Sequence, residues 1–317
     1  MCGIVGIVHN NQRDFQQNIL HMNDIQAHRG PDASGVEKLT GAILGHTRLS
    51  IVDIASGHQP MSCNSNKLFI TFNGEIYGYK EIKKGLDYPF KTNSDTEVLI
   101  ALYKQYGSKM LSKLSGMFAF AIWDDQERTL FLARDRFGEK PLYYGFTDDG
   151  DFIFASEIKA IIASKLLTPK VSGKAIGHYL QRLYIDPLET IYENIHALAP
   201  GSFLTYNDGR LEINRYFNYP ITQDISLADA TEIFQDKFDK SVQRQLIADV
   251  DVGAFLSGGL DSSTVVAIAQ KYNQNLKTFS FGFEGTMSEL SYAKEIANRY
   301  GTDHHELLAD KVDIADL

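Results

Sequence analysis

The stretch MCGIVGIV, residues 1–8, decides the fold of the first half of the chain. Four of its residues are β-branched, which favours a strand, and its two glycines would weaken a helix. It runs into polar residues after about eight positions and has no basic leader, so it does not read as a secretory signal. The stretch predicts a buried strand, and it places Cys2 directly beside the initiator methionine.

Outward from this strand, the first half is rich in further strands. Apolar runs bounded by turn residues predict them at 42–45, 68–72, 117–123, 129–133, 142–146 and 152–155. Helices are expected at 15–26 and 173–183, near Ser156, and from Ser94, where the string SDTE fits a capping box. Sheets with helices on their outer faces follow from this pattern.

The rhythm of the chain changes after Ser226. The pattern predicts a long helix, a strand at 250–256, a helix after Gly259, a strand at 278–283, a helix at 289–300 and a strand beginning near His304. Strands that alternate with helices indicate a parallel, doubly wound sheet. About three strands are few for a complete fold of this kind, so we expect an incomplete α/β domain.

Composition and charge exclude several classes of protein. The chain has 317 residues with 44% hydrophobic content, which suits two globular domains. A formal net charge of -9 without a dense Lys/Arg run argues against a nucleic-acid surface or a polybasic membrane patch. Two cysteines, Cys2 and Cys63, are too few for a disulfide framework and indicate a reducing compartment. No apolar run reaches the roughly 18 residues that span a bilayer, so we expect a cytoplasmic protein.

Cys2 has a distinctive chemistry once Met1 is removed, which a small second residue favours. The thiol then lies beside a free α-amine, whose ordinary pKa of about 7.7 to 8.0 lets it accept the thiol proton near neutral pH. Taken alone, a Met-Cys start is more often a buried strand residue or a plain terminal thiol. Other motifs in the first half favour the catalytic interpretation of Cys2.

Five short sequence motifs in the first half occur in a fixed order that indicates a family. They are CGIVG at 2–6, HRGPD at 28–32, HTRLSIVD at 46–53, FNGEIY at 72–77 and SDTE at 94–97. Together they resemble the class II glutamine amidotransferases, whose nucleophile is an N-terminal cysteine. The resemblance implies an α+β N-terminal-nucleophile fold (αββα), with two stacked antiparallel sheets between helices.

The resemblance also implies roles for individual residues. Hydrolysis of a carboxamide generates an oxyanion, and the Asn73 side chain and Gly74 backbone N–H match the family's oxyanion hole, beside the nucleophile Cys2. Arg48 matches the clamp for the glutamine α-carboxylate, and Asp95 with the turn at 73–75 matches the ammonium site. The implied glutamine-binding set is Arg48, Leu49, Ser50, Ile51, Val52, Asn73, Gly74, Glu75 and Asp95. Without the family, Arg48 would be read as a surface ion pair and Asp95 as a first-turn helix acid.

Two histidines in these strings, His28 and His46, could suggest a Cys/His dyad or a metal site. An amine base makes a catalytic histidine unnecessary, and the spacings typical of metal ligands are absent. We therefore expect both histidines to support the structure, and Cys63 to be an inert, partly buried thiol.

A second reaction centre is predicted at the string FLSGGLDSS, residues 255–263. It follows a strand and opens a helix, where backbone N–H groups and the helix dipole favour an anion. No Gly-Lys-Ser/Thr follows, so it is not a Walker A loop, and a glycine turn capped by Asp261 or Ser262 is the plain alternative. The string resembles the pyrophosphate loop of the N-type ATP pyrophosphatases. That resemblance implies an ATP site with pyrophosphate contacts from Ser257, Gly258, Gly259, Asp261, Ser262 and Ser263, base or ribose contacts from Leu256 and Phe281, and Asp261 as a Mg²⁺ ligand.

The two centres together resemble the B-type, glutamine-hydrolysing asparagine synthetases. Further strings carry the match at 135–144, 154–160 and 292–306. The resemblance implies that ATP activates aspartate as β-aspartyl-AMP and that ammonia released from glutamine at Cys2 converts it to asparagine, AMP and pyrophosphate. Glutamine, aspartate or a related carboxylate, and ATP are the expected small-molecule partners, and a homodimer is the candidate assembly.

We assign residues 1–185 to the amidotransferase domain, 186–225 to a connecting segment rich in turn signals, and 226–317 to the front part of the synthetase domain. The chain ends before the acceptor-binding segments expected downstream, so we expect glutaminase activity without efficient asparagine synthesis. Three alternatives stay open: amidation of a sugar carboxylate in surface-polysaccharide synthesis, a remnant that binds glutamine without turnover, and adenylation that uses free ammonia.

Overall fold

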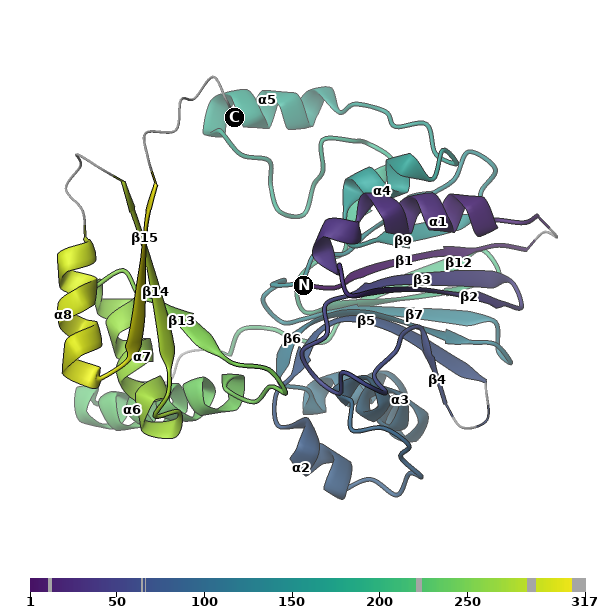
Figure 1. Cartoon of the computed structure of the whole chain (residues 1–317). Coiled ribbons are helices and arrows are strands. Elements are labelled where there is room, and N and C mark those ends of the chain that lie inside the picture. The colour runs from purple at the N-terminus through teal and green to yellow at the C-terminus, as the bar shows by residue number, and fades with distance from the viewer. Residues whose placement is uncertain (11–12, 64, 66, 221–223, 284–288, 310–317) are drawn as a thin grey trace. The chain divides into compact units, whose positions relative to one another are not determined.

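The computed structural model describes residues 1–10, 13–63, 65, 67–220, 224–283 and 289–309. The chain forms two units, Met1–Pro220 and Ile221–Leu317 (Figure 1). Residues 186–220, part of the predicted connecting segment 186–225, belong to the first unit. There they add strands to both of its sheets.

The first sheet of this unit contains the opening strand at its middle. Its strand order is β10-β8-β9-β1-β3-β2, and all neighbours are antiparallel. Gly3 of β1 is paired with Thr47 of β3, and this register brings Cys2 close to the end of β3. The strands are β1 (Gly3–Val8), β2 (Ala33–Leu39), β3 (Ala42–Arg48), β8 (Tyr143–Phe146), β9 (Phe152–Ala155) and β10 (Ile195–Ala197).

The second sheet of this unit has the order β12-β11-β7-β6-β5-β4, also antiparallel. β5 pairs along its whole length with β6, but on its other side β4 pairs only with Phe69 and Ile70. The later part of β5 therefore has a free edge. The strands are β4 (Met61–Ser62), β5 (Leu68–Ile76), β6 (Gly116–Asp124), β7 (Thr129–Arg134), β11 (Ser202–Asn207) and β12 (Arg210–Arg215).

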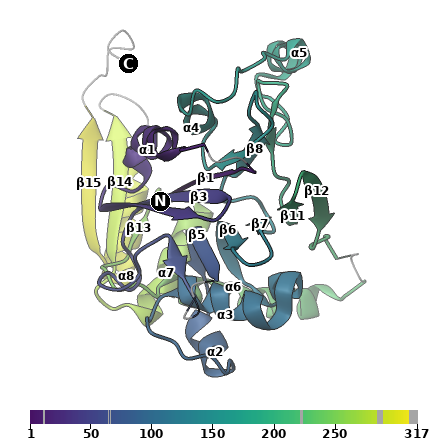
Figure 2. The same ribbon diagram turned by 90° about the vertical axis from the view of Figure 1, so that its right-hand side faces the viewer.

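Helices cover the outer faces of the two sheets, which gives four layers (Figure 2). One apolar cluster lies between the sheets, a second joins the first sheet to α1 (Gln16–Ile25) and α4 (Ile158–Ala163), and a third joins the second sheet to α3 (Asp95–Tyr106). The implied layering of two sheets between helices is confirmed. The first unit also contains α2 (Tyr79–Lys84), α5 (Gly173–Arg182) and the 3₁₀ turns η1 (Ala27–Arg29) and η2 (Gly107–Lys113).

The start of α3 differs in one detail from the expected capping box. The Ser94 hydroxyl accepts the Thr96 N–H at 3.1 Å, as an N-cap should. The Glu97 carboxylate does not return to the Ser94 N–H and instead accepts the N–H groups of Lys91 and Thr92, at 3.0 and 2.7 Å. Glu97 thus fixes the segment that leads into the helix, and the Asp95 carboxylate accepts the Ile76 N–H of β5 instead of capping the helix.

The second unit contains three parallel strands in the order β13-β14-β15. Its apolar core includes Val242, Leu256, Val266, Leu276 and Ala293, contributed by the helices and by the sheet they cover. The predicted alternation of strands and helices is confirmed, with a first strand shorter than the range 250–256. The elements are α6 (Leu227–Gln245), β13 (Gly253–Phe255), α7 (Leu260–Tyr272), β14 (Lys277–Phe283), α8 (Leu290–Tyr300) and β15 (Asp303–Ala309).

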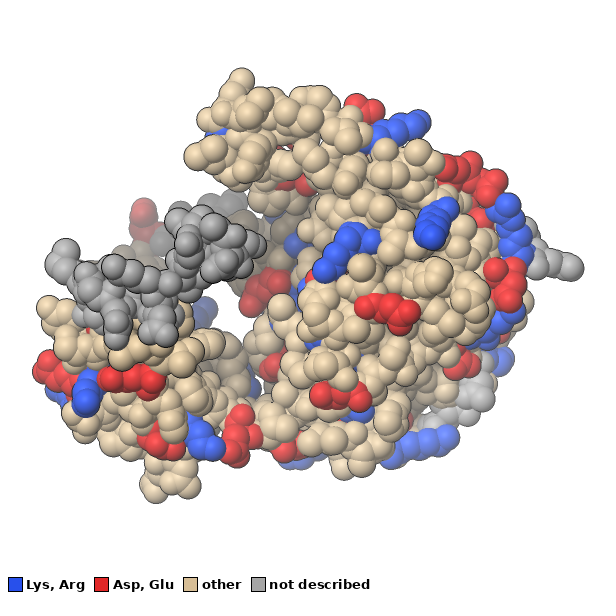
Figure 3. All heavy atoms as spheres, turned by 45° about the horizontal axis from the view of Figure 1, so that its top comes forward, with Lys and Arg blue, Asp and Glu red and all other residues tan. Residues whose placement is uncertain are grey.

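The surface charges and the hydropathy of the helices can be described from the same structure. Basic and acidic side chains are interspersed over the face of the first unit drawn in Figure 3. Within the ranges that the structure describes, no helix combines the length and the apolar character needed to cross a membrane.

Candidate active sites

A cavity of about 230 Å³ opens in the first unit around Cys2. It lies where the end of β3, the free edge of β5 and the start of α3 meet the residue that precedes β1. Of the residues singled out from the sequence, Ser50 does not line this cavity, and its N–H is bonded to Asp32 at 2.7 Å. Those that do line it are Cys2, Arg48, Leu49, Ile51, Val52, Asn73, Gly74, Glu75 and Asp95.

The Cys2 thiol is half-buried in the wall of this cavity. The Leu49 N–H donates to its sulfur at 3.4 Å, and the sulfur lies 3.7 Å from the Leu49 carbonyl oxygen. Burial raises the pKa of the thiol, so the group needs a base to become a thiolate. Burial also lowers the pKa of the chain's α-amine, which here belongs to Met1 at the same cavity. An amine in its neutral form can act as that base.

The free edge of β5 presents three N–H groups, at Phe72, Gly74 and Ile76, because alternate residues of a strand direct their backbone groups to the same side. The Phe72 N–H is taken by Gln59 Oε1 at 2.6 Å, and the Ile76 N–H by Asp95 Oδ2 at 3.1 Å. Gly74 lies between them and lines the cavity.

Phe118 of β6, which faces Gly74, directs its own backbone groups away from β5. Its N–H donates to Asp135 Oδ2 at 3.2 Å, and its carbonyl accepts the Asp135 N–H at 2.8 Å. The Gly74 N–H is therefore directed into the cavity. Position 74 also requires glycine, since a Cβ atom there would lie 2.1 Å from the Met117 carbonyl oxygen.

The Asn73 side chain is buried beside Gly74 with its hydrogen-bonding capacity unused. Only 1% of the residue is exposed, and neither its Nδ2 nor its Oδ1 has a partner in the described part of the chain. An unpaired amide in such a place costs about 1–3 kcal/mol, which a ligand that pairs with it would offset. With the Gly74 N–H it forms a donor pair suited to an oxyanion.

Arg48 enters the cavity from the end of β3 and is 4% exposed. Three of its N–H groups hold the loop that follows, donating to the carbonyl oxygens of Val52, Asp53 and Ile54 at 3.2, 2.7 and 3.1 Å. A guanidinium has five N–H donors, so two remain for a carboxylate. Arg48 both shapes the loop and retains the capacity to bind an anion.

Two carboxyl groups face the same cavity. Asp95 is 5% exposed, and burial raises its pKa to about 6. Burial also raises the pKa of Glu75. A cationic ligand between them would relieve the cost of keeping both charges buried, so the arrangement favours an ammonium group.

Gln59 and Lys140 line the cavity and were not identified as site residues from the sequence. Lys140 lies in the string at 135–144, where its N–H donates to the buried Asp135 carboxylate at 2.9 Å, and burial lowers the pKa of its ammonium. The sequence resemblance included this string but gave Lys140 no role in the site. Gln59 is not part of any recognised sequence motif, and it reaches β5 only through the tertiary fold.

His46 and His28 make contacts that support the structure. His46 is buried and lies 3.1 Å from the Phe72 carbonyl oxygen through Nε2, and burial lowers its pKa to about 4. A neutral imidazole at this position donates to that carbonyl. His28 contacts Glu157 Oε1 at 2.9 Å, and its ring does not line the cavity.

The second unit has a separate cavity of about 280 Å³ beside the string at 255–263. Leu256, Ser257, Ser262 and Phe281 line it, together with residues of β14 and α8. Gly258, Gly259, Asp261 and Ser263 belong to the same loop and the first turn of α7 without lining the cavity.

The loop before α7 is shaped by its own residues. Gly258 has a φ of 79°, and a Cβ atom there would lie 2.6 Å from Tyr292 Cβ, so only glycine fits. The Ser257 and Ser262 hydroxyls lie 2.9 Å apart, and no side chain caps the helix at Gly259. The first N–H groups of α7 are thus available to an anion.

Comparison with known families matches both units. The glutamine amidotransferase domain family matches residues 1–217, and the asparagine synthase family matches residues 234–317. Asparagine synthetase [glutamine-hydrolyzing] 1 of Bacillus subtilis is 38% identical over 96% of this chain and 49% of its own length. Asparagine synthetase B [glutamine-hydrolyzing] of Escherichia coli is 34% identical over 97% of this chain and 54% of its own length. The chain thus spans about half the length of these curated relatives.

Two solved structures share the fold at low sequence identity. The allosteric regulatory enzyme of purine biosynthesis has a TM-score of 0.54 and 16% identity, with 97% of this chain and 80% of that chain covered. Glutamine phosphoribosylpyrophosphate amidotransferase from B. subtilis, complexed with ADP and GMP, has a TM-score of 0.51 and 20% identity, with 96% and 65% covered. At these identities the likeness concerns the fold.

Proposed function

Because this chain belongs to the class II glutamine amidotransferase family and continues into an asparagine synthase domain, we propose that its first unit hydrolyses glutamine at Cys2. One observation carries the proposal. The Cys2 thiol, the Gly74 N–H, the unpaired Asn73 amide and the charged pair Arg48 and Asp95 all face a single cavity.

We assign the binding of glutamine to the charged groups of the cavity. The remaining N–H groups of Arg48 bind the α-carboxylate, and Asp95 with Glu75 binds the α-ammonium. These contacts place the side-chain amide of glutamine near Cys2. The product glutamate has the same α-groups and carries a γ-carboxylate in place of the amide. The buried Asn73 and Gly74 donors bind this carboxylate until glutamate leaves.

The chemical steps follow from the same geometry. After removal of Met1, the α-amine of Cys2 accepts the thiol proton, and the sulfur attacks the amide carbon of glutamine. Asn73 Nδ2 and the Gly74 N–H donate to the oxyanion that forms. The protonated amine then gives its proton to the departing ammonia, which leaves a γ-glutamyl thioester on Cys2. Water attacks this thioester, and glutamate is released.

The proposal is tested by incubating the purified chain with glutamine and measuring glutamate, after mass spectrometry has shown that Met1 is absent. We expect release by the wild type and none above background by Cys2→Ala. Equal rates for the two proteins would overturn the assignment.

We propose further that the complete protein uses this ammonia for ATP-dependent synthesis of asparagine from aspartate. The names of its relatives and the match to the asparagine synthase family support this substrate. In the second unit, the free N–H groups of α7 and the hydroxyls of Ser257 and Ser262 suit pyrophosphate. Adenylation turns the aspartate carboxylate into an electrophile with a good leaving group. A sugar carboxylate is the alternative acceptor, and product analysis with each acceptor distinguishes them.

The residues present also fit a Mg²⁺ ion bound with ATP. Asp261 supplies an exposed carboxylate in the first turn of α7, next to the proposed pyrophosphate site. Mg²⁺ favours one or two carboxylates together with phosphate oxygens, and it would neutralise charge on the leaving pyrophosphate. Within the described ranges, no group of three His, Cys, Asp or Glu side chains forms a metal site by itself.

A further inference from the structure

Cys2 lies outside the ladder of β1, which begins at Gly3. The thiol and the α-amine both extend from the Cys2 Cα atom, whose position depends on how the protein holds the peptide group between Cys2 and Gly3. The Leu49 N–H contacts the sulfur itself, and the Cys2 carbonyl group is a second point at which the protein holds this residue. Arg29 Nε donates to that carbonyl oxygen at 2.8 Å.

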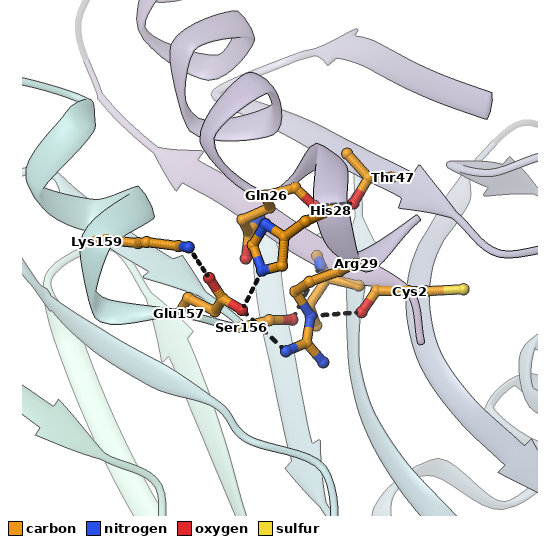
Figure 4. A network of polar contacts seen from close by, with 9 residues as sticks. Cys2, Gln26, His28, Arg29, Thr47, Ser156, Glu157 and Lys159 are labelled. Atoms are coloured by element: carbon orange, nitrogen blue, oxygen red, sulfur yellow. Dashed lines mark hydrogen bonds and ion pairs between the residues drawn. The ribbon is translucent and has the colours of Figure 1, made fainter. Parts of the chain in front are cut away.

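Arg29 is in turn held by Glu157. The guanidinium is 8% exposed, and its Nη1 lies 3.1 Å from Glu157 Oε1. Figure 4 shows the Cys2 sulfur pointing away from both residues. Arg29 and Glu157 thus bind the backbone of the nucleophile and leave its thiol unobstructed.

Glu157 is itself fixed to the strand that carries Cys2. The neighbouring Ser156 makes two hydrogen bonds to Ile4 of β1, with its hydroxyl at 3.0 Å from the Ile4 nitrogen and its N–H at 2.9 Å from the Ile4 oxygen. Burial disfavours the charged form of Glu157, but hydrogen bonds from Arg29, His28 and Lys159 outweigh it and lower the pKa of the carboxyl. The carboxylate is therefore charged at neutral pH.

We propose that Glu157 is a positioning residue for glutamine hydrolysis: it orients Arg29 on the Cys2 carbonyl and so fixes the position of the Cys2 Cα atom, from which the thiol and the α-amine extend. The inference rests on the proposed glutaminase. Misplacement of a reacting group by about 1 Å can cost on the order of 100-fold in rate, so loss of the orienting contact acts mainly on kcat. Glutamine binding through Arg48 and Asp95 is left intact.

The test compares Glu157→Gln with Lys159→Met. Lys159 contacts the other oxygen of the same carboxylate at 3.2 Å and lies outside the path from Glu157 to Cys2. We expect Glu157→Gln to lower kcat for glutamine hydrolysis on the order of tenfold with KM within about twofold, and Lys159→Met to change neither by more than about twofold. A Glu157→Gln protein that keeps its kcat, while the wild type is active, overturns the inference.

A double variant shows whether Glu157 acts through Arg29. Adding Glu157→Gln to Arg29→Met should cause no further loss of kcat, whereas independent roles would multiply the two losses and contradict the inference. If Glu157→Gln does not fold, as judged by circular dichroism, Glu157→Asp takes its place. An unchanged kcat in Glu157→Asp then overturns the inference, and a loss in kcat at constant KM supports it. A wild type without glutaminase activity would instead refute the proposed function.

Discussion

The cavity at Cys2 and the loop at 257–263 differ in how their polar groups are held. Around Cys2, residues far apart in the chain fix several of these groups: Gln59 and Asp95 take the N–H groups on either side of Gly74. In the loop of the second unit, the main contacts are local, such as the Ser257–Ser262 hydroxyl pair, and Phe255 is 89% exposed. A site built from the tertiary fold depends on many distant residues, whereas a phosphate loop depends on its own backbone. Variants in the two regions should therefore have different and separable effects.

The largest effect is expected from Asn73→Ala in the first region. It removes one of the two proposed oxyanion donors, so kcat for glutamine hydrolysis should fall about 10²–10³-fold with little change in KM. Steady-state kinetics measures both values. The matched control is Asn18→Ala, which removes an asparagine that contacts the Ser164 carbonyl oxygen away from the cavity. A fall in kcat of less than about tenfold would contradict the oxyanion role of Asn73.

A smaller effect is expected from Gly258→Ala in the second region. The added Cβ would lie 2.6 Å from Tyr292 Cβ, at a φ of 79° that alanine resists, so the loop must shift. ATP affinity, measured by calorimetry, should fall at least about tenfold while the glutaminase rate stays unchanged. Gly177→Ala is the control, because nothing lies within 4 Å of a Cβ at that helical position. Unaltered ATP binding in Gly258→Ala would show that this loop does not bind the nucleotide.

The smallest effect is expected from pH, and it concerns Asp95. Its folded pKa is raised to about 6, so the carboxyl becomes neutral below that pH and loses its attraction for the glutamine ammonium. Between pH 7 and pH 5.5 its ionised fraction falls about fourfold, and glutamine Kd in the inactive Cys2→Ala protein should rise by a similar factor. Calorimetric titration at the two pH values gives this ratio. The dependence should become clearly weaker in Asp95→Asn, where Glu75 is the remaining carboxyl of the pair, and an undiminished dependence there would contradict the role of Asp95.

The sequence predicted the elements that have strong apolar patterns. β1 and β6 are largely apolar and buried, and they were identified near their observed bounds. β5 was predicted over 68–72 and extends to Ile76, because the polar residues after Phe72 end the apolar signal before the strand ends. β2 was missed because its residues are half-buried or exposed and carry little apolar signal. β12 was missed for the same reason, since Leu211 and Ile213 are the only apolar residues of a largely exposed polar strand.

The candidate site was predictable where a residue belongs to a local string. Cys2, Arg48, Asn73 and Gly74 belong to such strings, and the structure brings all four to one cavity. Gln59 belongs to none, because its role depends on the packing of a loop against β5. Ser50 shows the converse, since membership of a string did not place it at the cavity.

The free edge of β5 has a further consequence. Unpaired backbone groups along a strand edge can recruit a strand from another chain and begin aggregation. Here β4 ends after two residues, and the side chains of Gln59, His46 and Asp95 occupy the backbone groups that a foreign strand would need. The Gly74 N–H, between the Gln59 and Asp95 contacts, faces the cavity of about 230 Å³ around Cys2. Gln59 and Asp95, which line the Cys2 cavity, thereby also obstruct the pairing of another strand at this edge.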